Sequence, residues 1–248
     1  MSQTFGARRY FFATASVIRH QGRAMLAAAP WSLAAFLLSL PFAILAATLA
    51  WTGSALYMLL ALINLIAFAR VTFAWHRVVV LGSGANPDAA RGGSAEARHL
   101  MVFGVLVLIV AVLARATGDL PYVLYMLMNG PDTNKFLAAL VPAVLVVWLP
   151  VLVCVAVLAL SLPRTAVTGD ASLQGIRAAM PYPRWPLVLA LAVLVSLGGF
   201  AHSGLTEYLH YATNAGLLWT AGYVVLFAVM TFVVAAMVAV AYRDGVRR

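Results

Sequence analysis

The sequence predicts an all-α protein, a polytopic transmembrane bundle of six helices with an N-terminal amphipathic interfacial helix. Of its 248 residues, 64% are hydrophobic and only 9% are charged, whereas a soluble domain is about 45–50% apolar and about 25% charged. A water-soluble fold of this size could not cover its surface with so few charges, and disorder requires low hydrophobicity. The composition therefore excludes an ordinary soluble protein and a disordered one.

Six apolar runs approach the length of about 20 residues that a spanning helix needs. They are Trp31–Trp51, Ala55–Trp75, Leu100–Thr117, Phe136–Leu162, Trp185–Phe200 and Leu217–Tyr242, and the fifth is expected to extend past His202. Pro41 lies in the first run, and Pro142 and Pro150 lie in the fourth, so these two helices are candidates for kinks. Residues 31–248 thus form the transmembrane domain, and residues 1–30 precede it.

Small residues are spaced for close contact between helices. Ala43 and Ala47 in the first run, and Ala235 and Ala239 in the sixth, recur at the four-residue spacing that brings them to one helix face. They serve packing within the chain or against a partner.

Basic residues indicate the orientation of the bundle. With the N-terminus placed in the cytoplasm, fourteen of the sixteen basic residues fall at or near the cytoplasmic side, and only Arg115 and Lys135 fall on the other. Lys and Arg accumulate in cytoplasmic loops of membrane proteins. The net charge of +9 is therefore a sign of topology and not of nucleic-acid binding, and both termini are predicted to be cytoplasmic.

Residues 4–29 have the pattern of a helix that lies in the membrane plane. Arg8, Arg9, Arg19, His20 and Arg23 share one arc of a helical wheel. Phe11, Ile18 and Met25 repeat every seven residues on the opposite arc. A basic amphipathic helix buries its apolar face among acyl chains and presents its arginines to headgroups, including anionic ones. A plain orientation signal is the alternative, and the two are compatible.

The end of the second run predicts a packing layer on the cytoplasmic side. Trp75, His76 and Arg77 are residue types that suit the headgroup interface, and four apolar residues, Val78–Leu81, follow them. If the helix continues, these four emerge from the bilayer and need cover. The N-terminal helix and a short elbow helix are the candidates to supply it.

Three connecting segments differ in character. Gly82–His99 is rich in small and polar residues and is expected to be a flexible linker. In Ser161–Pro186, Asp170 or Ser172 is placed to cap a short elbow helix over Leu173–Met180. The external loop 118–135 contains an apolar stretch with two tyrosines, which indicates a partly buried cap, a partner-binding patch or an extension of the third span.

Polar residues at membrane depth are the first suspects for function. Asn64 lies near the middle of the second run, and Arg70 lies two turns nearer the cytoplasm, without an acidic residue inside any run to pair with it. Arg70 either reaches the headgroups or a carbonyl, or it contacts an ion or substrate. Asn64 and Arg70 are therefore the candidate substrate-binding residues.

Recognisable catalytic patterns are lacking. The sequence has no Gly-x-Ser-x-Gly, no His-Glu-x-x-His and no paired carboxylates. Cys154 is a single cysteine, and Glu207 and His210, with His202 nearby, more readily form a polar interface cluster than a zinc site. We expect a protein that is not an enzyme and that has no metal and no cofactor.

Two motifs carry a resemblance to a known group of proteins. One is Trp75-His76-Arg77-Val78-Val79-Val80-Leu81-Gly82, and the other is Leu162-Pro163, Ala166, Ser172-Leu173 and Arg177-Ala178. Together they resemble bacterial six-helix inner-membrane proteins, a group similar to the membrane domain fused to some glycerophosphodiester phosphodiesterases. In those fused enzymes the chemistry belongs to a separate barrel domain. The resemblance implies an inner-membrane protein without a catalytic role for these motifs.

Two functions remain open on this basis. The first is a non-enzymatic accessory or scaffold protein, or a subunit of a larger membrane assembly, with a protein partner or a second copy of itself; it predicts a dry bundle. The second is a small-solute or lipid transporter or channel. It predicts a cavity lined by Asn64, Arg70, Pro142 and Pro150.

Overall fold

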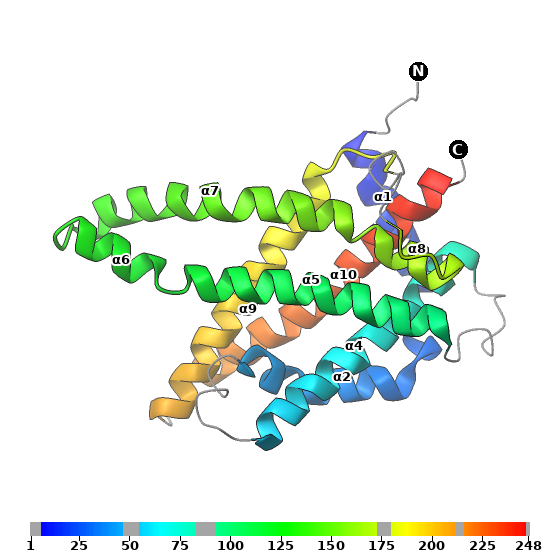
Figure 1. Ribbon diagram of the computed structural model, residues 1–248, viewed down its shortest axis with the longest axis horizontal. Helices are drawn as coiled ribbons and strands as arrows, with labels where there is room; N and C mark the ends of the chain where they lie inside the picture. The colour runs from blue at the N-terminus through cyan, green and yellow to red at the C-terminus, as the bar shows by residue number, and fades with distance from the viewer. Residues whose placement is uncertain (1–5, 47–54, 83–92, 173–179, 212–215, 247–248) are drawn as a thin grey trace.

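Every described element of the computed structural model is a helix, and the description covers residues 6–46, 55–82, 93–172, 180–211 and 216–246. The helices are α1 (Ala7–Ala28), α2 (Pro30–Ile44), α4 (Ala55–Leu81), α5 (Ser94–Thr117), α6 (Leu120–Leu127), α7 (Thr133–Leu158), α8 (Ser161–Thr168), α9 (Trp185–Tyr211) and α10 (Leu217–Val246) (Figure 1). The predicted all-α class is confirmed.

Five stretches are long and apolar enough to cross a membrane. They are Ala55–Leu81, Ser94–Leu127, Thr133–Thr168, Trp185–Leu209 and Leu217–Val246, and α1 with α2 would make a sixth, although these two are bent by 90° to each other. The chain is therefore a multi-pass membrane protein with five or six spans. The predicted runs from Ala55 onward each coincide with one of these stretches.

The first predicted run is only partly described. Pro30 lies in the first turn of α2, where its missing N–H and fixed φ suit a helix start. The 15 residues of α2 reach about 22 Å at 1.5 Å per residue, which is less than the hydrocarbon thickness of about 30 Å. Most of the rest of the run, from residue 47 to 51, lies outside the described residues.

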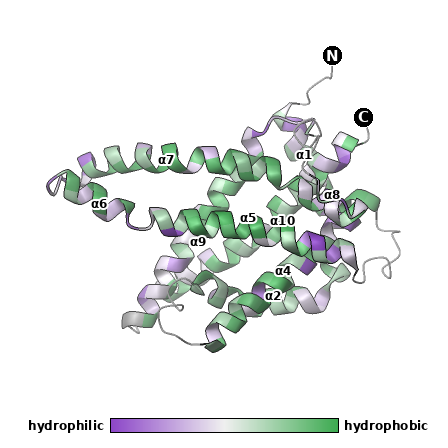
Figure 2. Ribbon diagram, in the orientation of Figure 1, coloured by the Kyte–Doolittle hydropathy of each residue, from purple (hydrophilic) through white to green (hydrophobic). Residues whose placement is uncertain are grey.

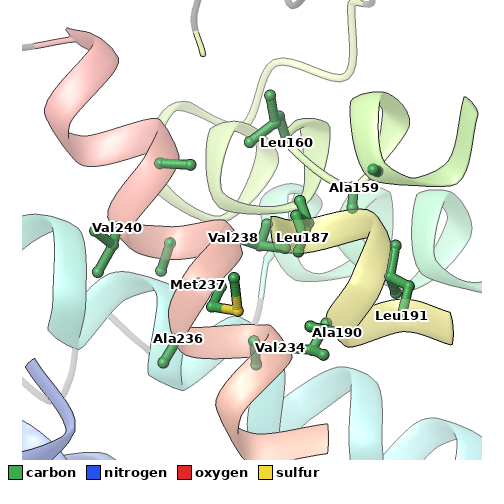
Figure 3. Packing of buried hydrophobic residues seen from close by; sticks show 14 of the residues in the cluster. Ala159, Leu160, Leu187, Ala190, Leu191, Val234, Ala236, Met237, Val238 and Val240 are labelled. Atoms are coloured by element: carbon green, nitrogen blue, oxygen red, sulfur yellow. The ribbon is translucent and has the colours of Figure 1, made fainter. Parts of the chain in front are cut away.

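The core lies between α10, α9 and α4. Ala236, Ala239 and Ala241 of α10 are fully buried, and Met237 and Val240 are buried beside them. Small side chains let helix backbones approach closely, which favours association in a membrane. Figure 3 shows Val238 of α10 beside Leu187 of α9, and Val234 beside Ala190. Half of the most apolar part of α10 is buried, so this helix is central to the bundle.

An apolar arm extends away from this core. It consists of α5, α6 and α7, with α6 at its tip (Figure 1), and Figure 2 shows it as predominantly hydrophobic. Only 11% of the most apolar window of Ser94–Leu127 is buried, and no residue of α6 is. α6 thus continues the stretch Ser94–Leu127 beyond α5 as an exposed helix, which agrees with an extension of the third span better than with a partly buried cap. Hydrocarbon is the medium in which such a surface is stable.

The prolines of α7 do not interrupt that helix. It runs from Thr133 to Leu158 through Pro142 and Pro150, and both prolines are exposed. α7 ends at Leu158 and α8 begins at Ser161, and together they form the stretch Thr133–Thr168. The predicted elbow helix over Leu173–Met180 falls largely on residues outside the described part, and α8 lies a dozen residues earlier.

A packing layer covers the end of α4 that was predicted to be cytoplasmic. α4 continues beyond the predicted run to Leu81, and α1, α8 and α10 pack against it. Val79 is buried, Val78 and Val80 are half-buried, and Leu81 is exposed. α8 and both chain ends lie toward one side of Figure 1, so the segments that carry most of the arginines meet at one end of the bundle.

Candidate functional site

Asn64 ties two helices together. Its side chain is buried in α4, and its amide nitrogen donates hydrogen bonds to the Phe36 carbonyl at 2.7 Å and to Ser39 Oγ at 3.1 Å, both on α2. In hydrocarbon no water is available to a polar side chain, so hydrogen bonds to a neighbouring helix satisfy its polar atoms instead. The amide of this candidate substrate-binding residue is thus already occupied by protein partners.

Arg70 forms an ion pair that the sequence pattern did not suggest. Its Nε lies 2.7 Å from Glu96 Oε1, and the two side chains are 57% and 18% exposed. Glu96 is in the first turn of α5, ahead of the apolar run that begins at Leu100, so a search for acidic residues inside the spans passes over it. Arg70 therefore has a carboxylate partner at the end of the neighbouring helix.

A hollow of about 250 Å³ opens at this ion pair. Its walls come from α4, from α5 and from the residue that precedes α5, and the lining residues are Ile66, Ala69, Arg70, Gly93, Glu96, Ala97 and Leu100. Apart from the ion pair the walls are apolar. This combination of a neutralised charge pair and an apolar wall suits an amphiphilic ligand.

Trp75 and His76, which the sequence pattern placed at the headgroup interface, are enclosed by protein, and Arg77 is half-buried. Trp75 is 3% exposed and His76 is 1% exposed, and the Trp75 ring packs edge-on against Phe232, 4.5 Å between centroids. Arg77 donates a hydrogen bond to the Ala166 carbonyl of α8 at 3.0 Å. The physical reason is that α1, α8 and α10 surround this turn of α4, which the helix alone would expose.

His99 of α5 lies next to His76. The two rings are 5.6 Å apart and edge-on. His99 Nε2 is 3.1 Å from Thr72 Oγ1, and His99 Nδ1 is 3.0 Å from the Leu162 carbonyl. His99 thereby joins α5 to α4 and to α8. The sequence placed both histidines near one border of the membrane, but it did not indicate that they meet.

His76 contrasts with its neighbour. Both of its ring nitrogens are buried without an aligned hydrogen bond to any described residue, and the backbone of Ala235 is beside the ring. A buried polar group without a partner costs free energy. The buried ring of His76 is therefore expected to lower the stability of the fold.

The N-terminal helix α1 packs on the bundle through one face and leaves its arginines exposed. Arg8, Arg9, Arg19 and Arg23 are exposed, as expected. Tyr10, Val17 and Met25 are buried against α4 and α10. Phe11, which the seven-residue repeat placed on the apolar arc, is 45% exposed. The contact face is therefore centred on Tyr10 and Val17, and Phe11 stays at its edge.

Tyr10 and Tyr182 form the attachment of α1. Their rings stack at 4.5 Å. Tyr10 Oη donates to the Met237 carbonyl at 2.9 Å, and Tyr182 Oη donates to Asp244 Oδ2 at 2.5 Å. Burial, followed by the hydrogen bond to Asp244, raises the pKa of Tyr182. Both phenols thus stay protonated and act as structural donors between α1, α10 and the segment before α9.

No three His, Cys, Asp or Glu side chains among the described residues are grouped so as to hold a metal. His202 and Glu207 belong to α9, and the side chain of His210 lies outside the described part. The arrangement at the arginine-rich end can hold helices together and, at Arg70 and Glu96, receive an amphiphile with a polar head. The chain matches no protein-family model, no curated protein and no solved structure.

Proposed function

We propose that this chain is a non-enzymatic integral protein of a bacterial inner membrane, an accessory or scaffold protein or a subunit of a larger membrane assembly. The observation that carries the proposal is that buried polar side chains are used as ties between helices. Asn64 joins α4 to α2, His99 joins α5 to α4 and α8, and Tyr10 joins α1 to α10. A transport path would instead need such groups to face a cavity.

The alternative, a small-solute or lipid transporter or channel, has less support. It expects Asn64, Arg70, Pro142 and Pro150 to line one cavity. Asn64 points to α2, Arg70 reaches α5, and both prolines are exposed on α7. For a transport path to open at Asn64, its amide would have to break the two hydrogen bonds to α2.

The proposed orientation places both termini in the cytoplasm. It rests on the excess of arginines at the end of the bundle where α1, α8 and the C-terminal turn of α10 pack together, because Lys and Arg are retained on that side. The four exposed arginines of α1 would then face the headgroups of the inner leaflet, where each contributes about 1 kcal/mol if the lipids are anionic. No role for nucleic acid is proposed.

Cysteine labelling in whole cells tests the orientation. Cys154 is exposed, so it is first replaced by Ala. Single cysteines are then introduced as Leu127→Cys on α6 and Val246→Cys at the end of α10, both exposed sites. A membrane-impermeant maleimide is expected to label the first in intact cells and the second only after permeabilisation. Labelling of the second in intact cells would refute the proposed orientation.

Two measurements on the purified protein separate the two functions. Cross-linking in native membranes followed by mass spectrometry should give reproducible links from this chain to another membrane protein or to a second copy. Vesicles containing the protein should show no more solute leakage or lipid flip-flop than empty vesicles. Flux that Asn64→Ala changes, while Cys154→Ala does not, would establish the transporter instead.

A further inference from the structure

The exposed ion pair between Arg70 and Glu96 is not explained by its contribution to stability. An ion pair this accessible contributes about 0–1 kcal/mol. A charged Arg at the bilayer centre costs about 2.5–3.5 kcal/mol and less toward the headgroups. Because 57% of the Arg70 side chain is uncovered by protein, something else has to solvate its guanidinium.

The depth of the Arg70–Glu96 pair in the membrane indicates what solvates the guanidinium. Glu96 lies in the first turn of α5, where the chain enters an apolar run, and Arg70 lies at the same level on α4. This is where a helix passes from headgroups to acyl chains. The hollow beside the pair continues along Ile66 and Leu100, both apolar. A ligand with a polar head and an alkyl chain fits both parts.

The hydrogen-bond donors and acceptors of the ion pair limit which kind of lipid headgroup can bind there. A guanidinium has five N–H donors. Arg70 meets Glu96 through Nε, 2.7 Å from Oε1, and its side chain remains 57% exposed. Its other donors present the planar fork that binds phosphate oxygens in pairs. A carboxylate accepts through both oxygens and at about four positions, so Glu96 can also accept a hydrogen bond from a cationic N–H group. The site thus offers a phosphate position next to an ammonium position.

Neighbouring charges do not alter this balance. Arg98 lies two residues beyond Glu96, on a different face of α5, and donates to the Gly169 carbonyl at 2.6 Å. Arg77 is directed to Ala166 of α8. Among the described residues, the walls of the hollow therefore contain one positive and one negative side chain. A lipid with a net negative charge would gain from Arg70 and be repelled by Glu96.

We propose that this hollow is a binding site for a zwitterionic phospholipid whose headgroup carries a primary ammonium, as in phosphatidylethanolamine. Arg70 holds the phosphate, Glu96 accepts a hydrogen bond from the ammonium, and an acyl chain lies along Ile66 and Leu100. A choline headgroup has no N–H to donate to Glu96, so the site discriminates against it. The proposal holds for a scaffold and for a transporter alike.

Native mass spectrometry of the full chain in detergent tests the site. The probes are phosphatidylethanolamine, phosphatidylcholine and phosphatidylglycerol with identical acyl chains. The wild type should retain the ethanolamine lipid about tenfold better than the other two, which corresponds to one charge-assisted hydrogen bond. Equal retention of all three lipids would overturn the proposal. Displacement of the lipid by millimolar inorganic phosphate would show a site for soluble phosphate, and it would also overturn the proposal.

Two variants and a matched control assign the binding to this pair. Arg70→Gln should lower retention of all three lipids, whereas Glu96→Gln should abolish the preference for ethanolamine over choline and keep the phosphate contact. Arg115→Gln removes a comparably exposed, carboxylate-paired arginine near the other end of α5 and should leave retention unchanged. If Arg70→Gln fails to fold, Glu96→Gln decides, because an intact ethanolamine preference in that variant refutes the site.

Discussion

The ring of His76 lies edge-on to the ring of His99, 5.6 Å between centroids. His99 contacts Thr72 Oγ1 and the Leu162 carbonyl at hydrogen-bonding distance, whereas His76 has only the backbone of Ala235 beside it and no aligned hydrogen bond among the described residues. Two buried imidazoles in contact thus have opposite energetic roles. His99 connects three helices, and its loss leaves Thr72 and the Leu162 carbonyl with one partner fewer. His76 fills space, and its polar atoms add a desolvation cost.

This contrast predicts opposite effects of the same substitution. His99→Leu should destabilise the protein by about 1–3 kcal/mol, the cost of an unmade buried hydrogen bond. His76→Leu should leave the stability unchanged or raise it, because it removes a polar group without breaking an aligned bond. Thermal unfolding of both variants in the same detergent measures the difference. Equal destabilisation would show that His76 has a polar partner after all.

The attachment of α1 predicts a measurable effect of one hydroxyl group. Tyr10→Phe keeps the stacking on Tyr182 and removes the hydrogen bond to the Met237 carbonyl. We expect a loss of about 1 kcal/mol and faster proteolysis at the exposed arginines of α1. Tyr122→Phe, on the exposed helix α6, is the control and should behave as wild type. An unchanged melting temperature for Tyr10→Phe would mean that stacking alone holds α1.

The contact between Gly204 of α9 and Thr220 of α10 requires a residue without a side chain at position 204. A Cβ at this position would collide with Thr220 Oγ1 of α10 and lie 3.1 Å from Thr220 Cγ2, whereas a Cβ at Gly199 meets nothing within 4 Å. Gly204→Ala should therefore cost about 1–3 kcal/mol, as overpacking does. Gly199→Ala on the same helix should be neutral. Unfolding in detergent compares them, and equal stabilities would argue against this contact.

The hydrogen bonds that Asp170 accepts after the end of α8 are expected to be lost in acid. The backbone N–H of Ser172, with help from Arg164, holds the pKa of this carboxyl below its usual value of 3.8. A lowered pKa means that the stabilisation is present above the unfolded-state pKa and is lost as the pH falls through the lower folded-state value. Asp170→Asn should lower the melting temperature at pH 6, and the difference from wild type should shrink below about pH 4. A difference that stays constant down to pH 3 would contradict this assignment.

Much of the helix layout could be predicted because a bilayer allows few solutions. Backbone groups in hydrocarbon must bond within a helix, so the ends of several apolar runs coincide with helix ends. Ala55 begins α4, Thr117 ends α5, and Trp185 begins α9. The gathering of α8 and both chain ends on one side also agrees with the arginine pattern. These properties depend on residue type and spacing alone.

The tertiary structure decided the environment of each polar side chain. Trp75 and His76 have the composition of an interface pair, yet α1, α8 and α10 bury them. Glu96 seemed to belong to a linker, but it pairs with Arg70 across 26 positions of sequence. Periodicity describes which face of one helix is apolar, and it contains no information on which neighbour covers that face. For this protein, hydropathy was sufficient to identify a membrane as the surrounding medium. The pairing of helices determined which residues remain available to a ligand.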